Sequence, residues 1–584
     1  MLLRFIGIVR KYSSFVTISK TNMNMDKCYF RHMQNDTIDI TFLYKINNAV
    51  RQFNLSRKTT DTLKLIFTRM ATNIQKVTKK SKGKKEPNED IEIIIKVLDA
   101  QSNTISEEIA CSELFSMTDP MKLTIQDQIY NIVFNAPYLQ SLSLPKSILA
   151  GFPVYPENFV AQYTDKQKSI FNWYKGSALN EKGRDIAEIH IKWTPIITGQ
   201  KYIPSTDDIG MKLKLECIPA NDTLIGPAVE VISKNVVEAG PGHCPFENRH
   251  LFTSKKLEGN SFRCVSYNIL ADLYCDSDFT RTALHPYCPP YALHIDYRKQ
   301  LIIKELLGYN ADIMCLQEVD SKIFNHYLKP ILESEVMEGR FYKKGKEVAE
   351  GLSCFYRSDR YRFLSENQIL LAEALQTQSY LQPVWTAVKA NEALKERVLD
   401  RSTVASATIL RSIDTPNEIL VIGNTHLYFH PDSDHIRLIQ GGIVIYWLQH
   451  LCNTLKEQNK ENRISLILCG DFNSVPSCGI YQLYTQGVAP NSLPDWSSNQ
   501  NEAIDNLTLN QEISLASACG TPEYTNFTEG FADCLDYIFY DTKNLTVAQV
   551  IPLPSIEELK ANTALPSVVF PSDHIAIVSD LQFK

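Results

Sequence analysis

The stretch Leu466-Ile467-Leu468-Cys469-Gly470-Asp471-Phe472-Asn473 decides the predicted fold, because an apolar run ends abruptly in charge. A short continuous apolar run is typical of a strand that is buried on both faces. The run Ile313-Met314-Cys315-Leu316 ends in the same way, in Gln317-Glu318. Open α/β sheets bind their ligands at such strand ends. Both stretches therefore predict a buried sheet with acidic groups at one edge.

The polar residues of these stretches predict a cation site. Strand side chains alternate, so Asp471 and Asn473 are expected on the same face, while Gly470 lets the backbone approach closely. An unpaired buried carboxylate is costly, and several together require a cation. Hard oxygen ligands without a Cys or His cluster favour Mg²⁺ or Mn²⁺ over zinc. Glu318, Asp471 and Asn473 are therefore candidate ligands of a hard divalent cation.

Four further motifs stand in one order around these two stretches. They are SYNIL with Asn268, NTHLYFHP with Asn424, His426 and Pro431, LDYIF with Asp536, and SDH with Asp573 and His574. Each motif alone is weak, since a single acid at a strand end is more often a surface residue and a single histidine is as often structural. The ordered set indicates a pocket of carboxylates, amides and imidazoles that suits a hard cation and a phosphate ester.

The chain around these motifs divides into a β-rich front and an α/β back. Apolar runs at 403–410 and 419–422 alternate with helical patterns at 298–307 and 437–456, which predicts an α/β sandwich over residues 262–584 with helices outside its sheets. Residues 28–240 show short alternating strands and one helical stretch at 60–75.

We divide this front part into a β-rich region, 28–150, and an immunoglobulin-like β-sandwich, 151–240. The second assignment depends on Trp173 and on the alternating strand that ends at Cys217, although no earlier cysteine lies close enough to supply the usual inter-sheet disulfide. Gly240-Pro241-Gly242 marks a turn, and residues 241–261 are expected to be a linker.

Length and charge limit the class of protein. The 584 residues are 44% hydrophobic, which predicts two or three globular domains. A net charge of -6 argues against bulk electrostatic binding of nucleic acid, so a phosphate-bearing ligand needs a local site. The fourteen cysteines lack CxxC spacing and are expected to be reduced core thiols. No stretch approaches the roughly 18 apolar residues of a membrane span, so no membrane insertion is expected.

Residues 1–25 have the composition of a mitochondrial transit peptide. They contain Arg4, Arg10, Lys11 and Lys20, several Ser and Thr, and no acid before Asp26. A secretory signal is the competing interpretation, but the two arginines interrupt its apolar stretch. The expected location is the mitochondrial matrix.

The ordered motifs resemble those of the exonuclease-endonuclease-phosphatase superfamily over residues 260–584. The resemblance implies the DNase I-like fold, a four-layer α/β sandwich of two packed sheets flanked by helices. The ending, with LDYIFYD, QVIPLPS and ALPSVVFPSDHIAIVSDL, is most similar to the mitochondrial 2′,5′-phosphodiesterase branch, which is close to the poly(A) deadenylases. In that branch a transit peptide and a β-rich region precede the nuclease domain, as they do here.

The resemblance also implies roles for the metal and water ligands. Glu318 would be the principal metal ligand, with Asn268 and Asp573 close by. Asp471 would orient or deprotonate the attacking water, and Asn473 would fix the phosphate or the metal.

Other matched positions would contact the substrate. His574 would donate hydrogen bonds to phosphate oxygens and be held in its tautomer by Asp536, and His426 and Asn424 would bind substrate. In the deadenylases a proline and a phenylalanine sandwich an adenine, and the matching positions are Pro431 and Phe531. Such stacking is worth roughly 1–3 kcal/mol per base and tolerates any base. A turn and a packing residue are the alternatives for these two positions.

The implied activity is Mg²⁺-dependent removal of adenylates from an RNA 3′ end with release of 5′-AMP. The implied RNA substrates are 2′,5′-linked oligoadenylates and the 3′ poly(A) of mitochondrial transcripts. Three alternatives stay open. An inositol-polyphosphate phosphatase would carry a CDRIL-like motif where this chain has Cys534-Leu535-Asp536-Tyr537-Ile538 without the arginine. A DNA-repair endonuclease leaves the β-rich front unexplained, and a silent RNA-binding scaffold would predict a lost carboxylate.

Overall fold

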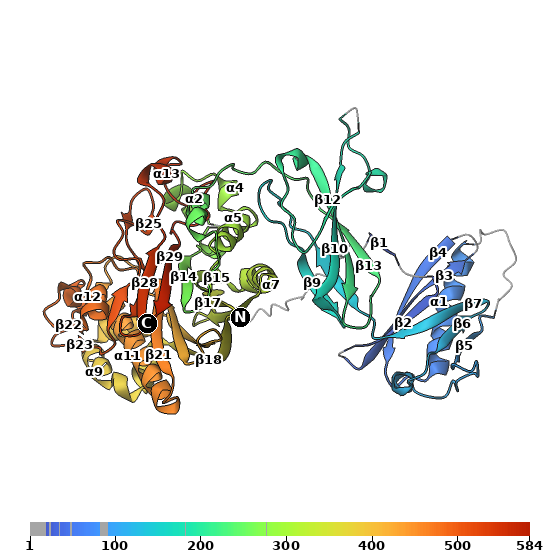
Figure 1. Cartoon of the computed structure of the whole chain (residues 1–584), viewed down its shortest axis with the longest axis horizontal. Helices are drawn as coiled ribbons and strands as arrows, with labels where there is room; N and C mark the ends of the chain where they lie inside the picture. The colour runs from blue at the N-terminus through green and yellow to red at the C-terminus, as the bar shows by residue number, and fades with distance from the viewer. Residues whose placement is uncertain are drawn as a thin grey trace, which may run out of the picture. The chain divides into compact units, whose positions relative to one another are not determined.

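The computed structural model describes residues 19–22, 25–33, 35–46, 49–81, 92–180, 183–275 and 277–584. The described chain falls into two compact units (Figure 1). The first takes its described residues from 1–146, 155–202 and 210–237, and the second comprises 147–154, 203–209 and the described part of 238–584. Residues 1–18 of the expected transit peptide lie outside the described residues, whereas Ser19–Asn22 form strand β1.

The first unit begins with a mixed sheet that one helix covers. Helix α1 (Leu63–Ser81) buries Leu63, Ile66, Met70 and Ile74 against this sheet, at the three- and four-residue spacing of an amphipathic helix. The helix expected at 60–75 is thereby confirmed. The strands, in the order β4-β3-β2-β7-β6-β5, are β2 (Lys27–Met33), β3 (Thr37–Ile46), β4 (Ala49–Lys58), β5 (Ile95–Leu98), β6 (Lys122–Ile125) and β7 (Gln128–Phe134).

A second β-module of this unit has the strand order β1-β13-β12-β10-β11, with a separate β8–β9 hairpin. Trp173 is buried in it and its indole N–H donates to Gly199 O at 2.9 Å. Strand β8 pairs with β9 across residue 151, so the module begins earlier than the predicted boundary. The finer immunoglobulin-like assignment stays a prediction. The strands are β8 (Tyr138–Ser143), β9 (Glu157–Gln162), β10 (Asp165–Ser177), β11 (Thr194–Thr198), β12 (Met211–Ala220) and β13 (Ala228–Ile232).

The second unit contains two six-stranded sheets among its described residues. The first sheet has the order β16-β17-β15-β14-β29-β28 and the second the order β18-β19-β20-β21-β27-β24. The first comprises β14 (Ser261–Asn268), β15 (Ile313–Asp320), β16 (Met337–Lys343), β17 (Glu350–Arg357), β28 (Leu545–Val550) and β29 (Ile577–Phe583). The second comprises β18 (Tyr361–Leu370), β19 (Val404–Ser412), β20 (Glu418–His426), β21 (Arg463–Asp471), β24 (Leu515–Ser517) and β27 (Asp536–Asp541).

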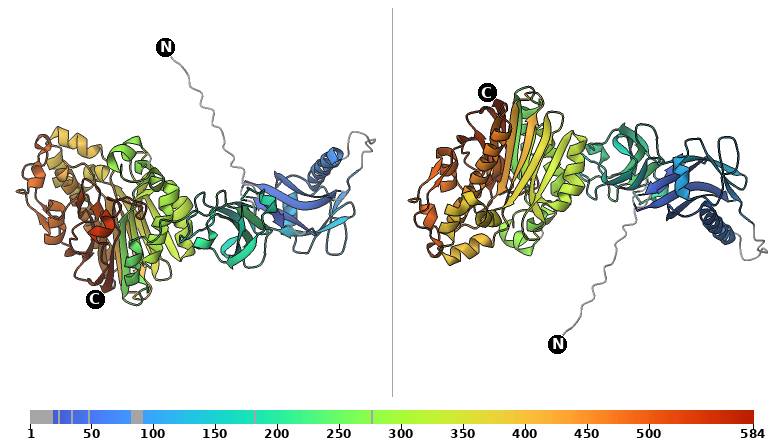
Figure 2. Two further views of the ribbon diagram at one scale, coloured as in Figure 1. Left: turned by 90° about the horizontal axis from the view of Figure 1, so that it is seen from above. Right: turned by 90° about the horizontal axis from the view of Figure 1, so that it is seen from below.

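The sheets pack face to face and helices cover their outer faces (Figure 2). Cys264 Sγ of β14 and Cys469 Sγ of β21 lie 3.7 Å apart across the inner core. On the outer face of the second sheet lie α8 (Leu371–Thr377), α9 (Gln382–Val388), α10 (Glu392–Leu399), α11 (Asp434–Gln458) and α12 (Gly479–Gln486). Beside the first sheet lie α2 (Phe246–His250), α4 (Pro290–Leu293), α5 (Ile295–Gly308), α7 (Lys329–Ser334) and α13 (Ile556–Lys560). The predicted four-layer α/β sandwich is confirmed.

The structure also shows the state of the cysteines and the character of the described helices. All fourteen cysteines are free thiols, and all except Cys478 and Cys519 are buried. Within the ranges that the structure describes, no helix has both the length and the apolar character needed to cross a lipid bilayer.

A parallel pair of strands lies at the centre of each sheet, and this brings the motifs together. Strand β14 runs parallel to β15, and β20 runs parallel to β21. Parallel neighbours end at the same edge of a sheet, so His426 at the end of β20 is paired with Asp471 at the end of β21. The antiparallel strand β27 begins at this edge, with Asp536 opposite Asp471. The motifs predicted from the sequence therefore meet at one edge.

Candidate active site

One amide joins the two principal carboxylates. Asn268, the last residue of β14, donates from Nδ2 to Glu318 Oε1 at 3.1 Å and to Asp471 Oδ2 at 3.0 Å. Glu318 belongs to the first sheet and Asp471 to the second. A single buried side chain therefore connects the sheets and holds both acids at a shared centre.

The backbone of Glu318 is distorted in a way that turns its side chain. The pairing of β15 with β17 shifts by one residue between Leu316 and Val319, and Glu318 has a φ of 54°. A β-bulge re-aims a side chain, and a left-handed non-glycine residue costs of order 1–3 kcal/mol. Ala271 N–H donates to Glu318 Oε2 at 3.0 Å and fixes the turned carboxylate.

The charge of Glu318 fits a bound divalent cation. Burial raises the pKa of Glu318 to about 7, and the charges of Glu350 and Asp573 add to this rise. The imidazole Nε2 of His426 is 4.0 Å from Glu318 Oε1, but burial holds the pKa of His426 well below its ordinary value, so the ring is neutral. A buried oxygen ligand next to other acids and a neutral ring is a hard-cation environment.

Asn473 lies beyond the strand that carries Asp471. Its φ is 48°, its backbone N–H donates to Asp471 Oδ1 at 2.9 Å, and its Nδ2 donates to Leu427 O at 3.0 Å. Strand alternation does not apply to Asn473, because β21 ends at Asp471 and Asn473 follows in a left-handed conformation; a shared face with Asp471 stays a prediction. The prediction for Gly470 is confirmed, because a Cβ there would lie 2.4 Å from Thr425 O of β20.

His574 and Asp536 form a hydrogen-bonded pair. His574 Nδ1 lies 2.8 Å from Asp536 Oδ2, and Thr525 Oγ1 donates to the same oxygen at 2.7 Å. The other ring nitrogen, Nε2, is 3.5 Å from Asp471 Oδ2. Burial disfavours a charged ring, but the carboxylates of Asp536 and Asp471 outweigh it and raise the pKa of His574 well above its ordinary value. His574 is therefore an imidazolium that donates from Nε2 at neutral pH.

His426 and Asp573 complete the cluster. His426 Nε2 is 3.6 Å from Asp471 Oδ2, while its buried Nδ1 has no hydrogen-bond partner among the described residues. Asp573 Oδ2 accepts a long hydrogen bond from Asn526 Nδ2 at 3.5 Å. The neutral ring of His426 leaves a site for one hydrogen bond from or to a bound group.

Two groups of side chains compete as the cation site. Asp471, Asp536 and His574 offer ligand atoms within 4.8 Å of one another. In this group His574 Nδ1 and Asp536 Oδ2 are already joined by a hydrogen bond of 2.8 Å, and Thr525 Oγ1 donates to the same oxygen. Glu318 and Asp471 each turn a carboxylate oxygen toward Asn268 Nδ2, so a cation shared by these two acids would lie beside that amide.

Comparison with known proteins supplies the family. Residues 265–574 match the endonuclease/exonuclease/phosphatase family, and residues 136–238 match the 2′,5′-phosphodiesterase 12-like N-terminal domain. The chain is 40% identical over 560 residues to the 2′,5′-phosphodiesterase 12 of Homo sapiens, which covers 91% of this chain and 90% of that protein. The chain belongs to the 2′,5′-phosphodiesterase 12 branch of the endonuclease/exonuclease/phosphatase family. Enzymes of this family depend on a divalent metal, as the site geometry suggests.

Two further proteins match part of this chain at lower identity. The chain is 28% identical over 341 residues to the CCR4-Not complex 3′-5′-exoribonuclease subunit Ccr4 of Candida albicans, a match that covers 56% of this chain and 41% of that protein. A crystal structure of ANGEL2, a 2′,3′-cyclic phosphatase, in complex with adenosine-2′,3′-vanadate is 23% identical and covers 56% of this chain and 97% of that one, with a TM-score of 0.45.

The family motif residue Asn424 does not face the substrate side. Its Nδ2 donates to Leu316 O and to Ser353 O, each at 3.1 Å, and its Oδ1 accepts from Gln317 Nε2 at 2.8 Å. These contacts connect β20 of the second sheet to β15 and β17 of the first. The prediction of substrate binding by Asn424 is wrong, because its amide is buried and serves to hold the sheets together below the acids.

The two predicted base-stacking residues are exposed. Phe531, with 45% of its surface exposed, closes the turn of the β25 (Asn526–Phe527) and β26 (Ala532–Asp533) hairpin, where Thr528 N–H donates to Phe531 O. Pro431 is exposed in the loop after β20. Their stacking role in this family member stays a prediction.

Sequence reasoning missed two supporting hydroxyl groups. Thr525 fixes Asp536, and Ser572 Oγ donates to Asn268 O at 2.7 Å while it accepts from His574 N–H at 3.1 Å. Ser572 stands beside the SDH acid and could have been suspected from that position. Thr525 lies eleven residues before Asp536, and nothing in the sequence indicates their contact.

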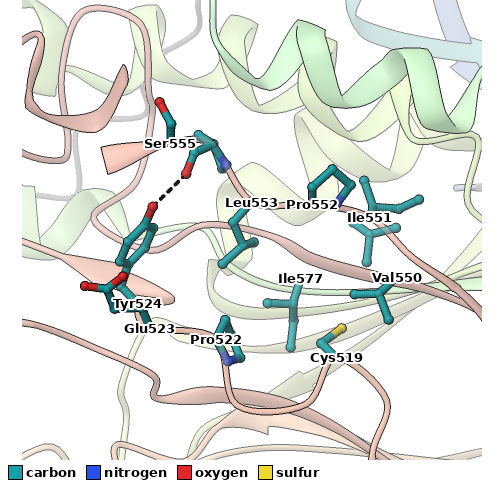
Figure 3. A pocket seen from close by; sticks show the side chains of 12 residues that line it. Cys519, Pro522, Glu523, Tyr524, Val550, Ile551, Pro552, Leu553, Ser555 and Ile577 are labelled. Carbon is teal, nitrogen blue, oxygen red and sulfur yellow. Dashed lines mark hydrogen bonds between the residues drawn. The ribbon is translucent and has the colours of Figure 1, made fainter. Parts of the chain in front are cut away.

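The second unit also contains an apolar pocket of 340 Å³ (Figure 3). Its lining includes Cys519, Tyr524, Val550 and Ile577, and Tyr524 Oη donates to Pro554 O at 2.8 Å across it. None of the acids or histidines of the site lines this pocket. We therefore assign no part of the family's chemistry to it.

Proposed function

We propose that this chain is a Mg²⁺-dependent phosphodiesterase that removes adenylates from 2′,5′-linked oligoadenylates and from the 3′ poly(A) of mitochondrial RNA, releasing 5′-AMP. The observation that carries the proposal is the pair Glu318 and Asp471 joined by Asn268. The substrate class is supported by the names of the relatives, a 2′,5′-phosphodiesterase and a 3′-5′-exoribonuclease.

Glu318 and Asp471 would hold the cation, which when bound neutralises charge on the phosphate ester, and the Asn268 amide keeps the two carboxylates together. Asp471 accepts the proton of the attacking water. In the metal-free chain burial raises the pKa of Asp471, and the charge of His574 opposes the rise. Attack at phosphorus breaks the bond to the ribose oxygen of the preceding nucleotide, which takes a proton from solvent and becomes a hydroxyl, so the phosphate stays on the 5′ carbon of the released adenosine.

His574 stabilises the charge that develops on the phosphate. Its Nε2–H donates to a non-bridging oxygen, and this donation strengthens as negative charge builds in the transition state. Asp536 keeps the ring charged and oriented, and Thr525 in turn holds Asp536. No covalent intermediate with the protein is needed.

Product analysis of the purified chain tests this proposal. The chain is incubated with Mg²⁺ and matched 2′,5′- and 3′,5′-linked triadenylates, with an inositol phosphate as the competing substrate. We expect 5′-AMP from the adenylates, and none when EDTA is present. Cleavage of the inositol phosphate alone would overturn the proposal.

A pair of variants connects this activity to the site. Glu318→Gln is expected to lower turnover by several orders of magnitude, because the cation loses its charged ligand. Glu373→Gln removes an equally charged but exposed acid from helix α8 and is expected to keep wild-type activity. Equal activity in the two variants would refute the assignment of Glu318.

We further propose that residues 1–25 direct the chain to the mitochondrial matrix. Four basic residues and no acid in this segment support the proposal. A fusion of these residues to a fluorescent reporter is expected to enter mitochondria, and the same fusion with Arg4 and Arg10 changed to Glu is expected to stay outside. Equal import of both fusions would contradict the proposal.

A further inference from the structure

A second polar group lies beside the acids of the active site. Glu350, the first residue of β17, has 1% of its surface exposed. Its Oε1 accepts hydrogen bonds from Lys344 Nζ at 2.6 Å and from Tyr274 Oη at 3.2 Å. A buried carboxylate is retained in a fold only with such partners, so these three side chains form one unit.

This unit borders the site on the side of the first sheet. Glu350 is paired across the sheet with Asp320, which follows Glu318 by two residues on β15. The segment that carries Tyr274 is fastened to the same strand, because Ala271 N–H donates to Glu318 Oε2 at 3.0 Å. Tyr274 and Glu318 are therefore held by one short stretch of backbone.

The electrostatic effect of the unit on the site supports this placement. The charge of Glu350 contributes to the raised pKa of Glu318. Burial is the largest cause of the lowered pKa of His426, and the positive charge of Lys344 is the second largest. The ammonium group thus acts on the histidine that faces both principal acids.

The position of Lys344 is fixed by its loop. Lys344 N–H donates to Glu350 O at 3.1 Å, and the next residue, Gly345, donates its N–H to Ser402 O at 2.9 Å. A Cβ on Gly345 would lie 2.7 Å from Leu370 Cδ1, so the loop packs closely there. The side chain of Lys344 still has 17% of its surface exposed.

We propose that Lys344 binds the phosphodiester next to the scissile one and that Tyr274 stacks on the nucleotide between them. This inference rests on the proposed function and adds a subsite to it. An ammonium has three N–H donors, of which Glu350 takes one, and its charge offsets the repulsion between the acids of the site and the RNA backbone. Tyr274, with 37% of its surface exposed, supplies a ring for a base. Glu350 is a positioning residue for both groups.

Substrates with one and two phosphodiesters separate this role from a structural one. The diadenylate with a free 5′ hydroxyl has only the scissile phosphodiester, whereas the triadenylate has one more. Steady-state kinetics of the full chain with Mg²⁺ compare Lys344→Met with the control Lys343→Met. Lys343 is the exposed neighbour on the same hairpin and carries the same charge.

Loss of one charge-assisted hydrogen bond predicts a fall of about tenfold or more in kcat/KM on the triadenylate for Lys344→Met. On the diadenylate the same variant is expected to lose severalfold less than on the triadenylate, and only through the effect of the unpaired Glu350 on Glu318 and His426, whereas Lys343→Met is expected to stay within about twofold of the wild type on both substrates. Lys344→Arg is expected to restore most of the triadenylate rate.

Equal losses on both substrates, or no loss on either, would overturn the subsite. A wild-type chain that cleaves neither compound would overturn the proposed function, and the subsite with it. Tyr274→Phe keeps the ring and is expected to retain the preference for the triadenylate, whereas Tyr274→Leu is expected to lose it. Full preference in the leucine variant would refute the stacking part of the proposal.

Discussion

Replacing Glu318 with glutamine removes the charge of this side chain and keeps its shape. In the metal-free protein, burial and the charges of Glu350 and Asp573 raise the pKa of Glu318 from 4.5 to about 7. A raised pKa in the folded state means that folding favours the protonated acid. Ionisation of Glu318 therefore lowers the free energy of unfolding progressively between pH 4.5 and pH 7, and the full cost is present above pH 7.

The size of this effect follows from the structure. The difference between 4.5 and 7 corresponds to about 3 kcal/mol at pH 8. The carboxylate accepts hydrogen bonds from Ala271 N–H and from Asn268 Nδ2, whereas one glutamine oxygen serves only one of these donors, at a cost of about 1 kcal/mol. Metal-free Glu318→Gln should therefore be more stable than the wild type by about 2 kcal/mol at pH 8. This advantage disappears as the pH falls toward 5.

Thermal unfolding in EDTA at pH 8 and pH 5 measures the effect of the Glu318 charge on stability. Titration with Mg²⁺ then measures the stabilisation by the cation. We expect Glu318→Gln to melt above the wild type at pH 8 without metal. Mg²⁺ should raise the wild-type midpoint by mass action and leave that of the variant unchanged. The exposed acid variant Glu373→Gln should follow the wild type throughout. A Glu318→Gln chain that melts below the wild type at pH 8 in EDTA, or that Mg²⁺ stabilises equally, would refute this account of the site.

Three further substitutions test other parts of the site. Asp536→Asn removes the charge that keeps His574 protonated. The kcat on the triadenylate should therefore fall about 10²- to 10⁴-fold with little change in KM. An unchanged kcat would contradict the pairing of Asp536 with His574. Gly470→Ala places a methyl group 2.4 Å from Thr425 O, and urea unfolding should show a loss of about 3 kcal/mol. Phe531→Ala should raise KM for the triadenylate about 5- to 100-fold at constant kcat, whereas an unchanged KM would leave Phe531 as a packing residue.

The sequence revealed the central strands better than the edge strands. Strand β21 is buried along nearly its whole length, so its apolar run was visible without the structure. Strand β18, at the edge of the same sheet, has mostly exposed side chains and no apolar run. Strands β8 and β9 pair with two register shifts, which removes the regular alternation that would have placed them in one module.

At the site, residue types were easier to predict than side-chain directions. The strand ends identified Glu318 and Asp471 because acids there follow apolar runs. The directions of Glu318 and Asn473 were not predictable, because both residues adopt a left-handed conformation where the strand pattern stops. Asn424 was assigned to substrate because its motif suggests it, whereas only the fold reveals that its amide joins the two sheets.

The apolar core between the sheets explains how the acids can be held together before a cation binds. Ionised Glu318 costs the metal-free protein about 3 kcal/mol at pH 8, and each fully buried Leu or Ile side chain contributes about 1.5–3 kcal/mol. Leu410, Ile422 and Ile467 of the inner core thus outweigh the cost of this charge. Because the core and the buried amides fix the strand ends, the cation meets a formed site, and its binding energy is not spent on ordering the chain.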